Sequence, residues 1–322
     1  MSTPNIYASV QSDFEAVNQF ILDQLHSDVP LVIKIGHHII ESGGKRMRPL
    51  LALLAANALG YDDDKHIKLA TVIEFLHTAT LLHDDVVDAS DMRRGKTTAN
   101  AKWGNEPSVL VGDFLYSRAF QILVETENLD VMRVLSNATC VIAEGEVLQL
   151  MNVKNPNVTE EQYMNVIHGK TAKLFEASTE CAALLSTTDK QQIKAAAKFG
   201  LNLGLAFQII DDILDYEGDA ETMGKNVGDD LAEGKPTLPL IQAMKCGTEE
   251  QKTLIRQAIR KGGLEDISEI QATVRDSGAL EYCRTKANEL ADEARQALSQ
   301  LPANIHTDTM HTVLELALNR KS

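Results

Sequence analysis

The sequence of 322 residues predicts an all-α protein, a multi-helix bundle that forms a single domain over residues 1–322. Nearly every segment has apolar residues at helical spacing, whereas no run alternates apolar and polar residues as a half-buried strand does. Aromatic residues make up only 5% of the chain, and blocks of Val, Ile and Thr, which favour strands, are scarce. No stretch resembles a flexible linker rich in Gly and Ser, so we expect one domain.

The expected helices are marked by their start and stop signals. The first begins at Pro49 and ends at Gly60, as expected from the preference for proline at helix starts and glycine after helix ends. A capping box, Thr159-Glu160-Glu161-Gln162, opens a later helix. The helices that we expect cover residues 49–59, 67–88, 108–125, 131–151, a stretch from 159 through 170, 190–216 and, with polar connections, 249–319.

Composition and charge exclude several classes of protein. Lys and Arg number 31 and Asp and Glu 46, which gives a formal charge of −15 and argues against binding to nucleic acid or to anionic membranes. The cysteines are too far apart for a zinc site or a disulfide framework. The N-terminus does not resemble a signal peptide, and the longest apolar stretch, Leu50–Leu59, is too short to span a bilayer. We therefore expect a cytoplasmic protein without stable membrane insertion.

Two copies of the pattern Asp-Asp-x-x-Asp carry most of the functional information. They are Asp84-Asp85-Val86-Val87-Asp88 and Asp211-Asp212-Ile213-Leu214-Asp215. Residues four apart lie on one face of a helix, so the first and last aspartates of each motif project together. Like charges at this spacing destabilise an isolated helix by roughly 0.2–0.5 kcal/mol per pair, and apolar neighbours increase the cost. A bound cation would remove it, and oxygen-only ligands suit Mg²⁺ shared with substrate phosphates.

Basic residues lie in polar segments close to the first motif. Gly43-Gly44-Lys45-Arg46-Met47-Arg48-Pro49 precedes a helix start, where free amides, the helix dipole and cationic side chains all favour an anion. Arg93 and Arg94 follow the first motif, and His77 shares a helix face with Asp84. Solvated basic turns and a core histidine are the alternative interpretations. Beside the four carboxylates of Asp84, Asp85, Asp88 and Asp91, a mixed site for metal and phosphate is favoured.

Further polar residues surround the second motif. Gly169-Lys170-Thr171 precedes it, and Gln208 lies three residues before Asp211. The glycine-lysine pairs that end in Lys225 and Lys235 follow it and could close over an anion. Each of these residues alone could equally be structural or solvated.

Two other classes of protein explain the sequence less well. A carboxylate bundle that binds iron or manganese needs Glu-x-x-His twice, and only Glu74-Phe75-Leu76-His77 matches. A non-catalytic interaction protein would leave every polar cluster without a purpose. The residues therefore favour an Mg²⁺-dependent enzyme that acts on diphosphates.

Together these motifs resemble the trans-isoprenyl diphosphate synthases, over about residues 20–245. The resemblance includes both aspartate motifs, the glycine-rich basic loop, Gly169-Lys170-Thr171 and Gly234-Lys235-Pro236-Thr237. It implies an isoprenoid synthase fold with a central active-site cavity, and usually a homodimer. Class I terpene cyclases share the first motif and the fold but usually have a different second motif. The second Asp-rich motif and the basic loop favour a chain-elongating prenyltransferase.

The resemblance also implies a role for each matching residue. The allylic substrate, farnesyl diphosphate or a relative of it, ionises at its C–O bond and is attacked by isopentenyl diphosphate. About two to three Mg²⁺ ions per active site stabilise the departing diphosphate, while Thr171 and Gln208 stabilise the allylic cation. The implied metal ligands are Asp84, Asp88 and Asp211, with Asp85, Asp212 and Asp215 as further ligands or supporting groups. The implied contacts to the allylic diphosphate are Arg93, Lys170, Lys225 and Lys235, and those to isopentenyl diphosphate are Lys45, Arg48, His77 and Arg94.

The length of the product is predicted from the residues that precede the first motif. In this family the growing chain runs along the helix that carries that motif, and a helix turn of about 5.4 Å matches roughly one isoprene unit. The first turn offers the small residues Ala79 and Thr80, and the next offers Phe75 and Leu76. Small residues favour a product longer than C20, and the resemblance is strongest to enzymes that make the octaprenyl (C40) side chain of ubiquinone. C35, C45 and C50 products remain alternatives, and a terpene cyclase is a more remote one.

Overall fold

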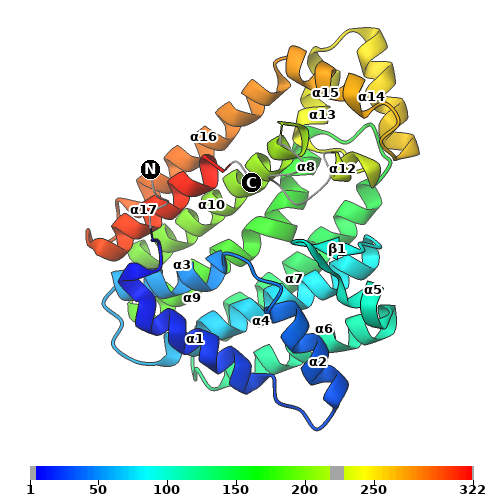
Figure 1. Cartoon of the computed structure of the whole chain (residues 1–322). Coiled ribbons are helices and arrows are strands. Elements are labelled where there is room, and N and C mark those ends of the chain that lie inside the picture. Colours follow the sequence, from blue (N-terminus) through cyan, green and yellow to red (C-terminus); the bar gives the residue numbers. More distant parts are fainter. Residues whose placement is uncertain (1–4, 218–227, 321–322) are drawn as a thin grey trace. The chain divides into compact units, whose positions relative to one another are not determined.

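The computed structural model describes residues 5–217 and 228–320, and these residues are almost entirely helical (Figure 1). The predicted all-α class is confirmed. The helices are η1 (Ala8–Val10), α1 (Gln11–Gln24), α2 (Pro30–Ile40), α3 (Met47–Ala58), α4 (Lys65–Val87), α5 (Ala99–Trp103), α6 (Asn105–Val124), α7 (Leu129–Asn152), α8 (Glu160–Ile167), η2 (His168–Ala172), α9 (Lys173–Ser186), α10 (Lys190–Glu217), α12 (Asp229–Ala232), α13 (Leu238–Cys246), α14 (Glu249–Lys261), α15 (Ile267–Asp276), α16 (Ala279–Leu298) and α17 (Ile305–Leu318). The two strands are β1 (Met92–Arg93) and β2 (Lys96–Thr97).

The small hairpin of β1 and β2 differs from the sequence prediction, which contained no strand. The strands are antiparallel, with Met92 opposite Thr97 and Arg93 opposite Lys96. Arg94 and Gly95 form the connection, and both have positive φ angles, of 52° and 74°. Two left-handed residues are what a tight two-residue hairpin turn requires. Strands of two residues are too short to show an alternating pattern, so periodicity could not reveal them.

Backbone contacts divide the chain into two compact units, which we describe separately. Unit 1 consists of residues 1–139, 177–197 and 297–313, and unit 2 of residues 140–176, 198–296 and 314–322. The division falls inside helices α7, α9, α10, α16 and α17, so neither unit is one continuous stretch of sequence. The prediction of a single domain remains a prediction.

Unit 1 is built around helix α4. This helix contacts α1, α3 and α6, and its buried residues lie on all sides, as in an interior helix. Helix α3 supplies a row of leucines to the same core, among them Leu50, Leu51 and Leu54, which are fully buried. The first aspartate motif lies at the C-terminal end of α4, so a well-packed helix fixes its position.

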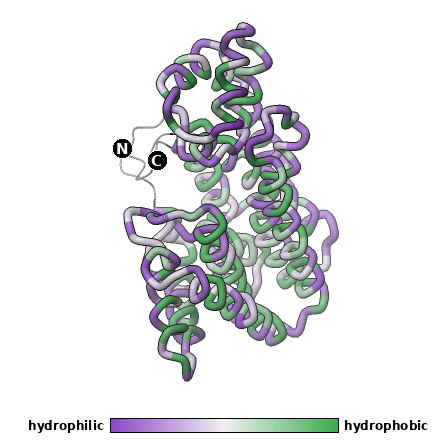
Figure 2. The backbone as a smooth tube through the Cα atoms, turned by 90° about the vertical axis from the view of Figure 1, so that its right-hand side faces the viewer, coloured by the Kyte–Doolittle hydropathy of each residue, from purple (hydrophilic) through white to green (hydrophobic). Residues whose placement is uncertain are grey.

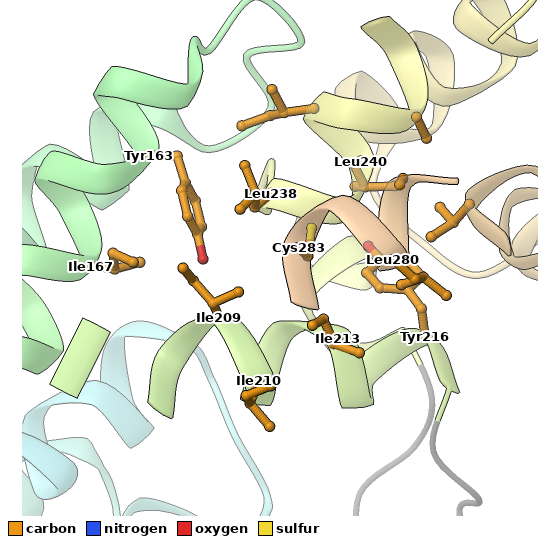
Figure 3. Packing of buried hydrophobic residues seen from close by; sticks show 14 of the residues in the cluster. Tyr163, Ile167, Ile209, Ile210, Ile213, Tyr216, Leu238, Leu240, Leu280 and Cys283 are labelled. Carbon is orange, nitrogen blue, oxygen red and sulfur yellow. The ribbon is translucent and has the colours of Figure 1, made fainter. Parts of the chain in front are cut away.

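Unit 2 has its own apolar cluster, to which α8, α10, α13 and α16 contribute (Figure 3). Ile209 and Ile213 of α10 lie among the labelled side chains of this cluster, with Tyr163 and Ile167 of α8 nearby. The second aspartate motif occupies the same turns of α10 as these isoleucines. Apolar burial on either side of the motif therefore fixes this part of α10.

Helix α10 is long and apolar enough to cross a membrane, judged by length and composition alone. It is also longer than Leu50–Leu59, which the sequence analysis took as the longest apolar stretch. Most of its apolar window is buried inside the protein, as in a core helix of a globular protein. Figure 2 shows hydrophilic and hydrophobic residues mixed along most helices, as is common in amphipathic helices.

A π-helical turn, η2, lies between α8 and α9 and carries Lys170 and Thr171. Two glycines from neighbouring helices contact this turn closely. A Cβ atom at Gly145 of α7 would lie 2.6 Å from the backbone nitrogen of Lys170, and one at Gly204 of α10 would lie 2.6 Å from Cα of Ala172. The absence of side chains at both positions therefore allows α7 and α10 to pack against the turn.

We expect Gly145→Ala to lower the free energy of unfolding by about 1–3 kcal/mol, because the added methyl group meets backbone atoms that cannot move aside. Alanine is intrinsically favoured over glycine in a helix by about 1 kcal/mol. A loss of stability would therefore show that the steric clash outweighs this preference. Urea unfolding measures it. Asn137→Ala, on the exposed face of α7, is the control and should change stability little. A Gly145→Ala variant as stable as the wild type would contradict the close packing.

Candidate active site

The first aspartate motif lies where a helix least tolerates negative charge. Asp84 is in the last turn of α4, and Asp88 caps the helix, with its backbone N–H donating to the carbonyl oxygen of Asp84 at 2.8 Å. Both side chains are half-buried. The C-terminal end of a helix carries partial negative charge, and the last turn of α4 contains no basic residue. A cation held by these carboxylates would offset both the dipole and their mutual repulsion.

Asp85, the middle aspartate, faces the protein interior instead. Its Oδ1 accepts a hydrogen bond from Nε of Arg93 at 2.7 Å, and Nη2 of Arg93 forms an ion pair with the same oxygen at 2.6 Å. Burial raises the pKa of Asp85, and the hydrogen bond and charge of Arg93 counteract this. Its backbone carbonyl also accepts from Asn100 at 3.1 Å. Asp85 therefore attaches the β1–β2 hairpin to the end of α4.

The tip of this hairpin meets the glycine-rich loop. Nη1 of Arg94 donates to the carbonyl oxygen of Gly43. A Cβ atom at Gly44 would lie 2.7 Å from Cζ of Arg94, and the φ angle of Gly44, 134°, also favours glycine at this position. The two basic segments that the sequence analysis singled out, 43–49 and 93–95, are thus brought together in unit 1.

Arg48 and His77 form a contact beside them. Nη1 of Arg48 lies 3.3 Å from Nε2 of His77. Burial lowers the pKa of His77 well below its ordinary value of 6.5, and the charges of Arg48 and Arg94 lower it further. The imidazole is therefore neutral at physiological pH. Burial also lowers the pKa of Arg48 to about 10, which leaves the guanidinium charged.

The sequence analysis gave no role to the buried carboxyl group of Glu74. Its Oε1 lies 3.8 Å from Nε of Arg46, and the charges of Arg46, Arg48 and Arg94 act on it. Burial raises the pKa of Glu74, and these three arginines lower it. Arg46 is held internally, since it also donates to Asn18 and to the carbonyl oxygen of Ile40. The sequence did offer a signal for this residue, because Glu74 lies one turn before His77 in an apolar helix.

In unit 2, the first aspartate of the second motif is partly exposed. Nη2 of Arg320 lies 3.2 Å from Oδ1 of Asp211, and its guanidinium carbon lies 4.4 Å from the ring centroid of Phe207. Asp215, one turn later, is buried. The side chain of Asp211 thus already attracts a cation within its own unit.

Asp212 is buried in a hydrogen-bonded network. Its Oδ2 accepts from the hydroxyl of Tyr163 and its Oδ1 from Nε2 of Gln208, both at 2.7 Å. Oε1 of Gln208 accepts from the hydroxyl of Thr171 at 2.8 Å. Burial and the charge of Asp230 raise the pKa of Asp212, while the two hydrogen bonds lower it. The sequence analysis missed Tyr163, because one tyrosine seven residues before Lys170 carries no pattern.

The lysines of unit 2 are also held by neighbours. Nζ of Lys170 donates to Glu146 at 2.6 Å and to Gln149 at 2.9 Å, both on α7. Lys235 forms an ion pair with Glu233. Lys225 lies outside the described residues. Thr171, Gln208 and the second motif are therefore grouped in unit 2, while the arginines and His77 are grouped with the first motif in unit 1.

The residues fit a hard divalent cation that is shared with a substrate. Asp84 and Asp88 offer oxygen ligands and are only half-buried, whereas the interior carboxylates Asp85 and Asp212 accept hydrogen bonds from protein groups. Over residues 5–217 and 228–320, no three His, Cys, Asp or Glu side chains form a ready metal cage. Mg²⁺ typically binds one or two carboxylates and completes its shell with water and substrate phosphates, so this arrangement suits it.

The expected chain-length residues lie below the first motif on α4. Phe75, Leu76 and Ala79 are buried, whereas Thr80 is half-buried and donates its hydroxyl proton to the carbonyl oxygen of His77 at 2.7 Å. Their role in setting product length remains a prediction.

Comparison with known proteins identifies the family. The polyprenyl synthetase family model matches residues 29–276. The chain belongs to the polyprenyl synthetase family. It is 51% identical over 321 residues to an octaprenyl diphosphate synthase from Escherichia coli K12, a match that covers 99% of each protein. It is also 51% identical over 317 residues to an all-trans-nonaprenyl-diphosphate synthase (geranyl-diphosphate specific) from Rhodobacter capsulatus, covering 98% of this chain and 97% of that one.

Solved structures of polyprenyl synthases share the fold of this family member. A polyprenyl synthase from Caulobacter crescentus CB15, complexed with calcium and isoprenyl diphosphate, is 42% identical with a TM-score of 0.95, and the match covers 100% of both chains. A decaprenyl diphosphate synthase from Rhodobacter capsulatus is 42% identical with a TM-score of 0.94, covering 98% of both. The resemblance stated from the motifs is thereby confirmed, and so is the isoprenoid synthase type of fold.

We expect His77 to make the protein less stable as the pH falls below 6.5. In that range the unfolded chain protonates this histidine while the folded protein does not, because its folded pKa is lowered. The unfolded state then binds more protons, so the free energy of unfolding decreases with decreasing pH. His77→Gln should flatten this decline between pH 6.5 and about 5, as measured by urea unfolding. His26→Gln, at an exposed position, should leave the slope unchanged; equal slopes in all three proteins would refute the assignment.

Proposed function

We propose that this polyprenyl synthetase is a long-chain trans-polyprenyl diphosphate synthase that adds isopentenyl diphosphate units to farnesyl diphosphate and makes octaprenyl diphosphate for a quinone side chain. The observation that carries the proposal is the 51% identity to an octaprenyl diphosphate synthase over nearly the whole of both chains. The nonaprenyl synthase has the same identity, and the small residues before the first motif support only a product longer than C20, so C35, C45 and C50 products are the alternatives.

The aspartate motifs supply the metal ligands in this proposal. The family generally depends on Mg²⁺, and we assign about two to three ions to the allylic diphosphate, with Asp84, Asp88 and Asp211 as their ligands. When bound, the ions stabilise negative charge that develops on the departing diphosphate. Asp85 and Asp212 then act as supporting groups, because their oxygens already accept hydrogen bonds from Arg93, Tyr163 and Gln208.

The basic residues bind the two diphosphates. Arg93, Lys170, Lys225 and Lys235 contact the allylic diphosphate, whose leaving group they help to stabilise. Isopentenyl diphosphate binds at Lys45, Arg48, His77 and Arg94, and the contact between Arg48 and His77 in unit 1 supports this assignment. Neutral His77 adds a hydrogen bond to the diphosphate without placing a further positive charge beside Arg48. Its contact with Arg48 orients the guanidinium. Thr171 and Gln208, which are joined by a hydrogen bond of 2.8 Å, present oxygen dipoles that stabilise the allylic cation.

We further propose a cytoplasmic homodimer. Monomeric soluble proteins rarely expose large apolar side chains in groups, and exposed ones often mark interfaces. In unit 1, Leu110 and Val124 of α6 are 65% and 58% exposed. In unit 2, Val147, Leu150 and Met151 near the end of α7 are also well exposed. Each group is a candidate contact with a second copy of the chain.

We expect the purified protein to convert farnesyl diphosphate and excess isopentenyl diphosphate to a C40 diphosphate in the presence of Mg²⁺, as read by mass spectrometry. EDTA should abolish the reaction. Asp84→Ala and Asp211→Ala should each lower kcat by several orders of magnitude, roughly 10³-fold or more, because each removes a ligand that supports charge on the leaving group.

Asp62→Ala, which removes an exposed aspartate outside both motifs, is the matched control and should retain full activity. Near-wild-type turnover in Asp84→Ala or Asp211→Ala would refute the metal assignment. A dominant C35, C45 or C50 product would keep the mechanism and correct the chain length. Conversion of farnesyl diphosphate to a hydrocarbon without condensation would make the protein a terpene cyclase.

We expect Ala79→Tyr to shorten the product to about C15–C20, because a bulky ring one turn (about 5.4 Å) below Asp84 would block the growing chain. Since Ala79 is fully buried, Thr80→Tyr at the neighbouring half-buried position guards against a variant that does not fold. Product mass gives the result. An unchanged product length in a folded variant of either kind would refute the placement of the growing chain along this face of α4.

A further inference from the structure

A continuous series of hydrogen bonds in unit 2 joins a buried tyrosine to the two residues assigned to the allylic cation. It runs from Tyr163 to Asp212, from Gln208 to the same carboxylate, and from Thr171 to Gln208. We propose that Tyr163 is a positioning residue that acts through Asp212 to fix the orientation of Gln208 and Thr171. The inference rests on the proposed role of Thr171 and Gln208 in stabilising the cation.

The direction of each hydrogen bond follows from the chemistry of the groups. The hydroxyl of Tyr163 donates to Oδ2 of Asp212, and Oδ1 of the same carboxylate is left to accept from Gln208. A side-chain amide has one donating and one accepting end, and its orientation is decided by its partners. With Nε2 of Gln208 committed to Asp212, Oε1 faces Thr171 and accepts its hydroxyl proton at 2.8 Å.

The orientation of the Thr171 hydroxyl determines what it can offer a substrate. Its proton points to Gln208, so the remaining lone pairs of Oγ1 are directed elsewhere. A fixed oxygen with its negative end available stabilises a developing positive charge, and it does so without reorganising during the reaction. If the amide of Gln208 were reversed, its NH₂ group would donate to Thr171 and occupy one of these lone pairs. The series of hydrogen bonds therefore fixes the amide of Gln208 in the orientation that leaves the lone pairs of Thr171 Oγ1 available.

The surroundings of Tyr163 explain how it holds Asp212. The residue lies on α8, directly after the capping box formed by Thr159 and Gln162, and its ring packs in the apolar cluster with Ile209 and Leu238 (Figure 3). The side chain is 4% exposed, so its hydroxyl cannot exchange its partner for bulk water. The hydroxyl of a buried tyrosine normally has a hydrogen-bond partner, and here the partner is the buried carboxylate of Asp212.

The deciding experiment compares binding of two unreactive substrate analogues in the presence of Mg²⁺. One is an ammonium analogue of farnesyl diphosphate with its charge at the position of the reacting carbon. The other is farnesyl thiodiphosphate, which lacks that charge. We expect Tyr163→Phe to weaken the ammonium analogue about tenfold by calorimetry while the thiodiphosphate changes less than about twofold. We also expect kcat to fall about tenfold with an unchanged KM for isopentenyl diphosphate.

Tyr282→Phe is the matched control. It too removes a tyrosine hydroxyl from a carboxylate in unit 2, since the hydroxyl of Tyr282 lies 2.9 Å from both oxygens of Glu160, but it leaves Asp212 untouched. It should bind both analogues as the wild type does.

The outcomes separate the inference from the proposed function. Thr171→Val tests the proposed function. If the wild type shows no preference for the ammonium analogue and Thr171→Val does not change binding, the role assigned to Thr171 is wrong. If Thr171→Val abolishes a preference that Tyr163→Phe retains, the proposed function stands and the positioning role of Tyr163 is refuted. An equal loss of both analogues in Tyr163→Phe would show a merely structural role and would also overturn the inference.

Discussion

The compensation of concentrated negative charge governs the structure of both motif regions. Six aspartates occupy two short helical segments, and in the first of them the end of α4 adds the negative pole of its dipole. Two of the carboxylates that the structure turns inward are held by hydrogen-bond donors, Asp85 by Arg93, and Asp212 by Tyr163 and Gln208. The first aspartate of each motif stays partly accessible. Hydrogen bonds to the inward carboxylates and access of a cation to the outward ones together allow each helical segment to carry more negative charge than an isolated helix would tolerate.

In the basic cluster of unit 1, positive charge is concentrated and a buried carboxyl group compensates it. Arg46, Arg48 and Arg94 approach one another around Glu74, whose buried carboxyl group reduces their mutual repulsion. Glycines at 43 and 44 bring backbone close enough for Arg94 to be held by a carbonyl oxygen. The neutral state of His77 follows from this environment, since a second positive charge beside Arg48 is costly in a desolvated position. This arrangement concentrates positive charge at the position where we propose that a diphosphate binds.

Much of this could be predicted from the sequence, because motif residues act through their spacing. The helices around Pro49, the capping box at Thr159 and the all-α class all follow from local rules, and the aspartate motifs from a four-residue period. Lys45, Arg48 and His77 were assigned to one phosphate site, and the structure brings Arg48 and His77 together. The hairpin escaped prediction because its strands have two residues each. Tyr163 and Glu74 escaped because their importance depends on partners distant in sequence, which periodicity cannot reveal.

The π-helical turn at residues 168–172 has a consequence for the length of the chain in this region. A turn with hydrogen bonds five residues apart contains one residue more than the corresponding α-helical register, so α8 and α9 are out of phase by about 100°. Removal of one residue here would convert the segment to regular helix and rotate Tyr163 away from Asp212 while leaving Phe175 in place. Homologous proteins that keep this site should therefore keep the number of residues in this turn, which also carries Lys170 and Thr171.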